Sequence, residues 1–400
     1  MEGPAARGKP GTPSLLRELN DRAALELLLA DGPLTRAQLS ERTGVSKVTV
    51  SQMLARLEER GLVRIAGEQA GGRGPNAALY AAVPSSAYVA GLYVELGLVS
   101  AAIADVTGTR VAEATVDPNG SADPVGTVRD AVSRACESAG IDLSALSAVV
   151  IGSPGVLDPS TGAPRLAVNL PTWHEGVLDG LREVFHRPVV IENDVNLAAT
   201  AERAEGAAAG LDDFVLVWLG TGLGLATMIG GQVLRGSGGA AGEIGWMPVH
   251  GTLLPSGSEH PGKAGLQALA GGWAMQALAT EHGFPAGSPA EAVAAAVADA
   301  SRGGAHGRDF LDEVAHRVAI GVAAVCVVLD PGLVVLGGPV GHAGGEELAT
   351  RVAAEVPRIC LARPSVVPTT VPGQPVLRGA MQAALAHARA GLLGSLGLEP

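Results

Sequence analysis

Residues 35–61 read TRAQLSERTGVSKVTVSQMLARLEERG, a stretch that encodes two short helices joined by a tight turn. Thr35 and Gln38 have the spacing of a capping box, which predicts the start of the first helix. Ser46 is a suitable N-cap for the second helix, and Gly61 ends it. One face of this second helix is apolar, with Val50, Met53, Leu54 and Leu57. The pattern predicts a helix-turn-helix.

The flanking residues extend this unit to a winged helix-turn-helix. Apolar residues at helical spacing predict a further helix over 14–30, and 62–66 and 78–83 are expected strands around a glycine-rich loop. Gly, Pro and charged residues dominate the first thirteen positions, as is typical of a flexible arm. We therefore divide the chain into an arm at 1–13, a winged helix-turn-helix DNA-binding domain at 14–85 and a body at 86–400.

The outer face of the second helix carries groups that suit DNA. Hydroxyl, amide and cationic side chains can bond base edges or phosphates, and Val48 can touch a thymine methyl. Arg73 lies in a Gly-Gly-Arg-Gly run, as a wing-tip arginine that enters a minor groove would. The alternative is an ordinary three-helix packing module in which the same side chains form a solvated surface. The candidate DNA contacts are Ser46, Lys47, Val48, Thr49, Gln52, Arg56 and Arg73.

Charge is divided unevenly between the two parts. Residues 1–85 carry 11 Lys+Arg and 9 Asp+Glu, a net of +2, whereas the rest of the chain has a net of −14. An acidic body repels polyanions, so nucleic acid is expected to bind only at the N-terminal part.

Composition excludes several classes of protein. A hydrophobic share of 47% is too high for a disordered chain. The apolar run at 318–329 is shorter than the roughly 20 residues of a membrane span, and the N-terminus lacks the apolar run of a signal peptide. Three widely spaced cysteines form neither a disulfide framework nor a CxxC pair. We therefore expect a cytoplasmic protein without membrane contact.

From residue 88 onward, expected strands alternate with helices, which indicates an α/β body of two domains. Three strand-like runs precede a helix within 88–139, and three more fall within 214–235, which suggests two related halves. Among the expected helices are 265–282 and 344–355. The expected strands are 88–94, 99–105, 111–116, 147–151, 188–192, 214–219, 223–229 and 333–336.

Six short motifs of the body, in this order, resemble those of the ROK family of bacterial repressors, uncharacterised reading frames and sugar kinases. The motifs are Gly152-Ser-Pro-Gly155, Asn169-Leu-Pro-x-Trp173, Glu192-Asn-Asp-Val-Asn196, Leu219-Gly-Thr-Gly-Leu-Gly224, Ala241-Gly-Glu-Ile-Gly245 and Leu336-Gly-Gly338. The resemblance covers residues 88–395 and implies an actin/hexokinase-like (ribonuclease H-like) pair of lobes with a sugar cleft between them. A winged helix fused in front is similar to the arrangement of the family's xylose and N-acetylglucosamine repressors.

Polar side chains of these motifs are candidates for ligand binding, because ligand clefts of α/β folds form at loops that follow strands. Amide and carboxylate groups pair with sugar hydroxyls. The resemblance implies that Asp194 matches the base of the family's kinases, and that Glu243 is a second carboxylate near the sugar. The alternative is a strand-to-helix turn in which Asp194 caps a helix at 195. The candidate ligand contacts are Asn169, Asn193, Asp194 and Glu243.

The phosphate motifs depart in part from those of the family's kinases. Those kinases begin with Asp-x-Gly-Gly-Thr, where this chain has Glu95-Leu-Gly-Leu-Val99, so that Leu98 adds bulk. The second phosphate loop, Gly220–Gly224, is retained. The alternative to phosphate binding is a strand-to-strand turn with a structural role only. We therefore expect no catalytic residue, with Asp194 a vestigial base, and no cofactor.

The resemblance also implies a zinc site whose ligands this chain lacks. The family uses one histidine and three cysteines, and the matching positions here are Trp246, Ser256, Ser258 and Lys263. These groups cannot form a tetrahedral nitrogen and sulfur site, and the nearby His250 and His260 supply only two ligands. Gly265 also replaces a sugar-binding glutamate of the family. No metal site is expected.

Together these features predict a DNA-binding transcriptional regulator, a repressor of sugar-related genes, rather than an enzyme. Its expected partners are double-stranded operator DNA and a sugar or sugar-derived effector bound in the degenerate kinase cleft. A homodimer or a dimer of dimers would match a palindromic site with half-sites about 34 Å apart. Two alternatives stay open: an ATP-dependent sugar kinase with an accessory DNA-binding domain, and a ligand-independent DNA-binding regulator.

Overall fold

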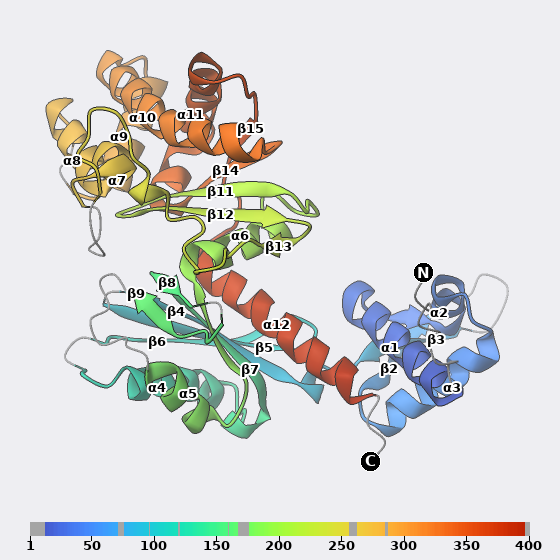
Figure 1. Ribbon diagram of the computed structural model, residues 1–400. Helices are drawn as coiled ribbons and strands as arrows, with labels where there is room; N and C mark the ends of the chain where they lie inside the picture. Colours follow the sequence, from blue (N-terminus) through green and yellow to red (C-terminus); the bar gives the residue numbers. More distant parts are fainter. Residues whose placement is uncertain are drawn as a thin grey trace, which may run out of the picture.

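The computed structural model describes residues 13–70, 76–95, 97–118, 121–158, 160–166, 176–255, 262–284 and 287–396. A small N-terminal domain is joined to a body of two lobes, and helix α12 (Pro375–Ser395) runs from between the lobes to that domain (Figure 1). The arm expected at 1–13 lies outside the described residues, except for Pro13 at the start of the first helix. Within the described ranges, no helix combines the length and apolarity needed to cross a membrane.

The N-terminal domain is the predicted winged helix-turn-helix. Its elements are α1 (Pro13–Asp31), β1 (Leu34–Thr35), α2 (Arg36–Thr43), α3 (Lys47–Glu59), β2 (Val63–Gln69) and β3 (Ala77–Ala82). The expected capping box is present, because Thr35 N donates to Gln38 Oε1 at 2.8 Å and Gln38 N donates to Thr35 Oγ1 at 3.3 Å. Ser46 caps α3 and accepts a hydrogen bond from Thr49 N at 3.2 Å. Both helix starts were therefore predictable from local sequence.

The end of α12 completes the core of this domain. Leu393 and Leu396 are buried in the same apolar cluster as Leu25, Met53 and Tyr80. The guanidinium of Arg60, just after α3, donates to the carbonyl oxygens of Ser395 at 2.8 Å and Leu396 at 3.4 Å. The last helix of the chain is thus an integral part of the N-terminal domain.

Each lobe of the body is built on a five-stranded sheet, and the two sheets have the same topology. The first has the order β10-β7-β4-β5-β6, and the second has the order β13-β12-β11-β14-β15. In each, the first three strands of the lobe are antiparallel and the last two add in parallel. The expectation of two related halves is confirmed.

The first lobe contains β4 (Tyr88–Glu95), β5 (Leu98–Asp105), β6 (Arg110–Val116), α4 (Pro124–Ser138), β7 (Leu146–Ser153), the hairpin β8 (Val156–Leu157) and β9 (Pro164–Leu166), α5 (Gly176–Phe185) and β10 (Val189–Asn193). The second contains β11 (Phe214–Leu219), β12 (Leu223–Ile229), β13 (Gln232–Val233), α7 (Gly265–Ala270), α8 (Gly272–Glu281), α9 (Pro289–Ser301), α10 (Ala305–Leu329), β14 (Leu333–Gly337), α11 (Gly338–Ile359) and β15 (Ser365–Pro368). Short 3-10 turns occur at Pro84–Ser86, Leu143–Ala145 and Ile244–Trp246.

The body is layered, with two helices between the sheets. Helices α4 and α5 cover the outer face of the first sheet, and α7 to α11 cover the outer face of the second (Figure 1). Helices α6 (Asp194–Glu205) and α12 share one buried apolar cluster with the inner faces of both sheets. They cross closely, because a Cβ atom at Gly379 of α12 would lie 1.8 Å from the carbonyl oxygen of Leu197 in α6.

Several elements differ from their predicted form, and the short strands β1, β8 and β9 were not expected. The single helix expected over 265–282 is divided into α7 and α8 at Gly271, whose backbone is extended. The helix expected over 344–355 is longer and is kinked at Gly345, which has φ of 49°. No strand was expected at β15, whose Pro368 is tolerated because the strand lies at the edge of its sheet.

Candidate DNA-binding surface and interlobe cleft

The N-terminal half of α3 presents polar side chains to solvent. Lys47 and Gln52 are exposed, and Val48 is 69% exposed although it is apolar. Thr49 is partly exposed, and its hydroxyl lies 2.9 Å from that of the capping residue Ser46. The opposite face of the helix is buried, as the apolar spacing predicted. These groups are therefore available to a partner, next to a helix N-terminus that favours phosphate.

Arg56 is used differently from the sequence prediction. We expected it to face outward, but its Nε donates to Asp21 Oδ2 at 2.8 Å and its Nη2 lies 2.5 Å from Asp21 Oδ1. The hydrogen bond to Asp21 raises the pKa of Arg56. Asp21 belongs to α1 and is largely buried, so this pair fastens α3 to α1. Arg73, the expected wing-tip residue, lies outside the described residues.

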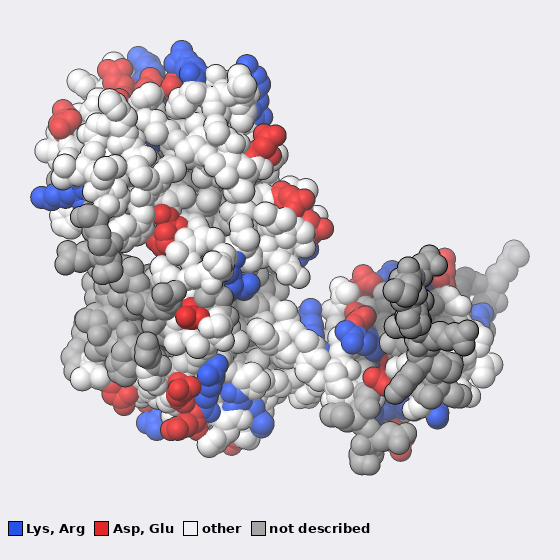
Figure 2. All heavy atoms as spheres, viewed as in Figure 1, with Lys and Arg blue, Asp and Glu red and all other residues white. Residues whose placement is uncertain are grey.

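Basic and acidic side chains are interspersed on the N-terminal domain. Figure 2 shows both signs over the part of its surface that is described on this face. Arg36 is engaged within the domain, where its guanidinium lies over the Tyr80 ring at 5.2 Å from the centroid. Arg64, on the wing strand β2, is exposed, and sequence reasoning did not single it out. DNA binding would therefore depend on a few individually positioned side chains rather than on a strong positive electrostatic potential over the N-terminal domain.

In the interlobe cleft, Asn193 is a structural cap. Its Oδ1 accepts hydrogen bonds from the backbone nitrogens of Val195 at 3.0 Å and Asn196 at 3.1 Å, which starts α6. Its Nδ2 donates to Gly155 O at 3.0 Å. Asp194 Oδ1 also accepts from Val195 N, at 2.9 Å, so both residues of the expected turn contribute to the cap. The positions of Asn193 and Asp194 are thus fixed before any ligand is present.

A buried carboxylate holds this turn to the second lobe. Glu192 Oε1 accepts from Asn193 N and from Asn196 Nδ2, both at 2.9 Å. Its Oε2 accepts from Arg235, with Nε at 2.7 Å and Nη2 at 2.6 Å. Because Arg235 follows β13, this ion pair crosses from one lobe to the other.

Acidic groups gather in the cleft. Burial raises the pKa of Asp194 to about 6, and the charge of Glu95 adds to the effect. Burial, together with the charge of Asp194, also raises the pKa of Glu243, which precedes the Ile244–Trp246 turn. Burial and the charges of Asp194 and Glu95 raise the pKa of Tyr93 on β4. These groups lie near enough for their charges to interact, and their oxygens can accept hydrogen bonds from the hydroxyls of an uncharged ligand.

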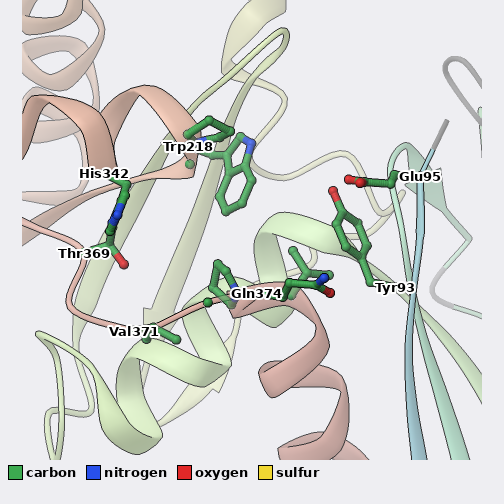
Figure 3. A pocket seen from close by; sticks show the side chains of 12 residues that line it. Tyr93, Glu95, Trp218, His342, Thr369, Val371 and Gln374 are labelled. Carbon is green, nitrogen blue, oxygen red and sulfur yellow. The ribbon is translucent and has the colours of Figure 1, made fainter. Parts of the chain in front are cut away.

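A cavity of about 250 Å³ opens beside Tyr93 and Glu95, at the start of α12. Figure 3 shows Tyr93 and Glu95 on one side, Trp218 and His342 on the other, and Gln374 between them. These side chains come from β4, β11, α11 and the residue that precedes α12. Except for Glu95, none of them was singled out from the sequence, because no local motif indicates that such distant positions converge. Asn169 lies outside the described residues.

Comparison with known proteins identifies the body. A sequence model of the ROK family matches residues 94–396, which is more than half of the chain. The chain belongs to the ROK family. A model of the MarR family matches residues 19–74, within the winged helix-turn-helix.

Relatives include both kinases and repressors. The chain is 34% identical over 221 residues to a glucokinase of Halalkalibacterium halodurans, covering 50% of this chain and 64% of that one. It is 26% identical over 243 residues to the xylose repressor of Bacillus subtilis, covering 59% of this chain and 62% of that one. In both comparisons the chain spans less than two thirds of the relative's length.

A solved structure matches nearly the whole chain. It is that of a ROK family transcriptional regulator, a homolog of the E. coli MLC protein, with a TM-score of 0.74 at 18% identity. The match covers 96% of this chain and 99% of the other, so the winged helix-turn-helix and the two lobes occur together in a known fold.

The second phosphate motif of the ROK pattern, Gly220–Gly224, is held by internal contacts. Gln267 is buried, its Oε1 accepts from Leu223 N at 3.0 Å, and its Nε2 donates to Thr221 O at 2.9 Å. A Cβ atom at Gly224 would lie 2.7 Å from a methyl carbon of Val195, so this glycine permits β12 to approach α6. These contacts give the loop a structural role that does not require a nucleotide.

The segment that matches the ROK zinc motif is closed by backbone hydrogen bonds. Gly265 N donates to Leu253 O, and Leu266 N donates to Met247 O, both at 2.9 Å. Gly265 has φ of 56°, and a Cβ atom there would lie 2.9 Å from Gly245 O. Ser256, Ser258 and His260 lie outside the described residues. In the ranges that are described, no group of three His, Cys, Asp or Glu residues could hold a metal ion.

Proposed function

We propose that this ROK protein is a DNA-binding transcriptional regulator, and specifically a repressor of sugar-related genes. The observation that carries the proposal is the exposed N-terminal half of α3 in a winged helix-turn-helix that is joined to a ROK body. The repressor relative supports it, and the glucokinase relative suggests that the regulated genes concern sugars.

The proposed DNA contacts are on α3 and the wing. Lys47 and the helix N-terminus would bind a phosphate, while Val48, Thr49 and Gln52 would face base edges in the major groove. Ser46 would contribute its exposed hydroxyl, and Arg73 remains a proposed contact of the wing. Arg56 is left out because Asp21 engages its guanidinium. Binding as a homodimer or a dimer of dimers would present two such helices to a palindromic operator.

The proposed effector is a sugar or a sugar derivative in the cleft. Asp194 and Glu243 would accept hydrogen bonds from its hydroxyls, and Asn169 would be a third contact. Asn193 would act by positioning Asp194, because both ends of its amide are already bonded to the backbone. A ligand that favours one arrangement of the lobes would shift the position of the N-terminal domain through α12.

Replacing Lys47 by Ala is expected to weaken binding to a selected operator by about 1 kcal/mol, because one charged phosphate contact is lost. The slope of log affinity against log salt concentration should also become shallower by about one unit. Fluorescence anisotropy with a DNA fragment selected from a random library measures both. The matched control is Arg129→Ala, which removes an exposed cation from the body. Equal effects of the two substitutions would contradict the assignment of α3 as the recognition helix.

The kinase alternative makes a separate prediction. Phosphoryl transfer needs positioned and neutralised phosphates, and Leu98 and Val99 stand in the first phosphate turn, so we expect no useful sugar-kinase activity. A coupled assay with ATP and glucose, xylose, N-acetylglucosamine or mannose should stay at background. Turnover of about 1 s⁻¹ that disappears in Asp194→Asn would instead establish the kinase.

A further inference from the structure

The loop that carries Glu243 begins at Arg235 and is rich in glycine. Four of the seven residues at 236–242 are glycine, so the loop keeps much conformational freedom unless its ends are held. Its end is fixed on β12, because Leu225 N donates to Gly242 O at 2.9 Å. Its start is closed on the loop itself, because Ala241 N donates to Arg235 O at 3.3 Å. The backbone of Arg235 is thus part of the same closed loop as Glu243.

The side chain of Arg235 reaches the turn that carries Asp194. Two of its nitrogens contact one oxygen of Glu192, with Nε at 2.7 Å and Nη2 at 2.6 Å from Oε2. The other oxygen of that carboxylate accepts from Asn193 N and from Asn196 Nδ2. Charge-assisted hydrogen bonds of this kind are short and directional. Because both oxygens of Glu192 are engaged, a shift of Arg235 would be passed on to the turn.

The two partners of this ion pair differ in burial. The side chain of Glu192 is 10% exposed, whereas that of Arg235 is 51% exposed. Among the residues that the structure describes, Arg235 is the one ion-pair partner of Glu192. A buried carboxylate that loses its cation is left with an uncompensated charge, which costs far more than the loss of a surface pair. The pair therefore favours the arrangement of the lobes in which Arg235 reaches Glu192.

We propose that Arg235 is a positioning residue of the cleft, and that its ion pair with Glu192 is a latch that holds the two lobes together and fixes the spacing of Asp194 and Glu243 before a ligand binds. The importance of this spacing for an effector rests on the function proposed above. Arg235 acts through Glu192 and through its own loop, so it need not touch the ligand. Because the two carboxylates are already placed, a ligand with hydroxyls at matching positions would bind at a smaller cost in ordering.

The experiment measures the distance between the lobes in the full-length protein, without ligand or DNA. Nitroxide labels on Asp130→Cys in α4 and Asp309→Cys in α10 report this distance by double electron–electron resonance, because both positions are exposed. Cys360→Ser removes the native thiol that is partly exposed. Arg235→Gln is expected to shift the distance distribution to longer values and to broaden it, because Glu192 is left buried without its cation.

The matched control is Arg110→Gln. It breaks an ion pair of the same 2.6 Å length to Glu113, and the Arg110 side chain is 49% exposed, but both partners of this pair belong to β6. The distance distribution of this variant should equal that of the parent. Equal distributions in the parent and in Arg235→Gln would overturn the latch.

Further variants separate a latch from a contact that only supports the fold. Glu192→Gln should produce the same shift as Arg235→Gln, and the double variant should shift no further than either, because one interaction is lost in all three. Arg235→Lys keeps the positive charge and should restore part of the parental distribution, although it cannot make two contacts. Additive shifts in the double variant would contradict the proposal.

Calorimetry with glucose, xylose, N-acetylglucosamine and mannose tests the link to the effector. A sugar that binds the parent should bind Arg235→Gln at least about tenfold more weakly, and equal affinity would overturn the positioning role. The absence of heat with all four sugars would overturn the effector role of the cleft, whereas the interlobe distances would still decide the latch. A latch in a protein that selects no DNA would overturn the regulator function alone.

Discussion

At pH 8, replacing Asp194 by Asn is expected to raise the free energy of unfolding by about 2–3 kcal/mol. The reason is that burial raises the pKa of this carboxyl from 3.8 to about 6, so its ionised form opposes folding. Because the folded-state pKa is the higher one, the gain from Asn is largest above pH 6. It should fall to about 1.5 kcal/mol at pH 5 and nearly vanish below about pH 4.

Urea unfolding of both proteins at pH 5 and pH 8 measures this difference. The Asn side chain can still accept the hydrogen bond that Val195 N donates to Asp194, so the helix cap is preserved. Asp309→Asn, which changes an exposed carboxylate on α10, is the matched control and should show no gain that depends on pH. A variant at Asp194 that is no more stable than the parent at pH 8 would contradict the burial argument.

The expected increase in the free energy of unfolding of Asp194→Asn has a functional meaning. A carboxylate that lowers stability at neutral pH is kept more readily for binding or catalysis than for packing. Asp194 interacts through its charge with Glu95, Glu243 and Tyr93, none of which carries a positive charge that would neutralise it. If the regulator function is correct, the same Asp194→Asn variant should leave DNA affinity without effector unchanged and should weaken any response to a sugar.

Local signals in the sequence predicted the helix starts and the two related halves. Thr35, Gln38 and Ser46 act on backbone groups within three residues, so their effect does not depend on the rest of the fold. Strand alternation in each half likewise reflects burial on a sheet, and the two sheets have matching orders. Such features are determined by residues that lie close together in the sequence, so they can be predicted without knowledge of the fold.

The features that sequence reasoning missed depend on contacts between distant positions. Arg56 faces Asp21 across 35 positions, and helical periodicity alone could not reveal that partner. Gln267 supports the Gly220–Gly224 loop from 44 to 46 positions away, so a motif that resembles a nucleotide loop is held by one buried amide. The cavity lining combines β4, β11, α11 and the start of α12, and only the folded topology brings them together.

Replacing Gly379 by Ala is expected to lower the free energy of unfolding by about 3 kcal/mol. A Cβ atom there would lie 1.8 Å from the carbonyl oxygen and 2.5 Å from the carbonyl carbon of Leu197. Both atoms are backbone of α6, so no side-chain rotation can relieve the overlap and the two helices must separate. Their separation would disturb the apolar cluster between the sheets, which α6 and α12 share.

Gly391→Ala on the same helix is the matched control. A Cβ atom at Gly391 would have no neighbour within 4 Å, so Ala should stabilise α12 by about 0.5–1 kcal/mol through its higher helix propensity. Urea unfolding of the two variants under one set of conditions separates steric overlap from propensity. Equal stabilities would mean that α6 and α12 do not cross at Gly379. The opposite signs expected here would instead show that α12 is packed tightly against α6 near its start, at Gly379, whereas Gly391 near its other end has room for a side chain.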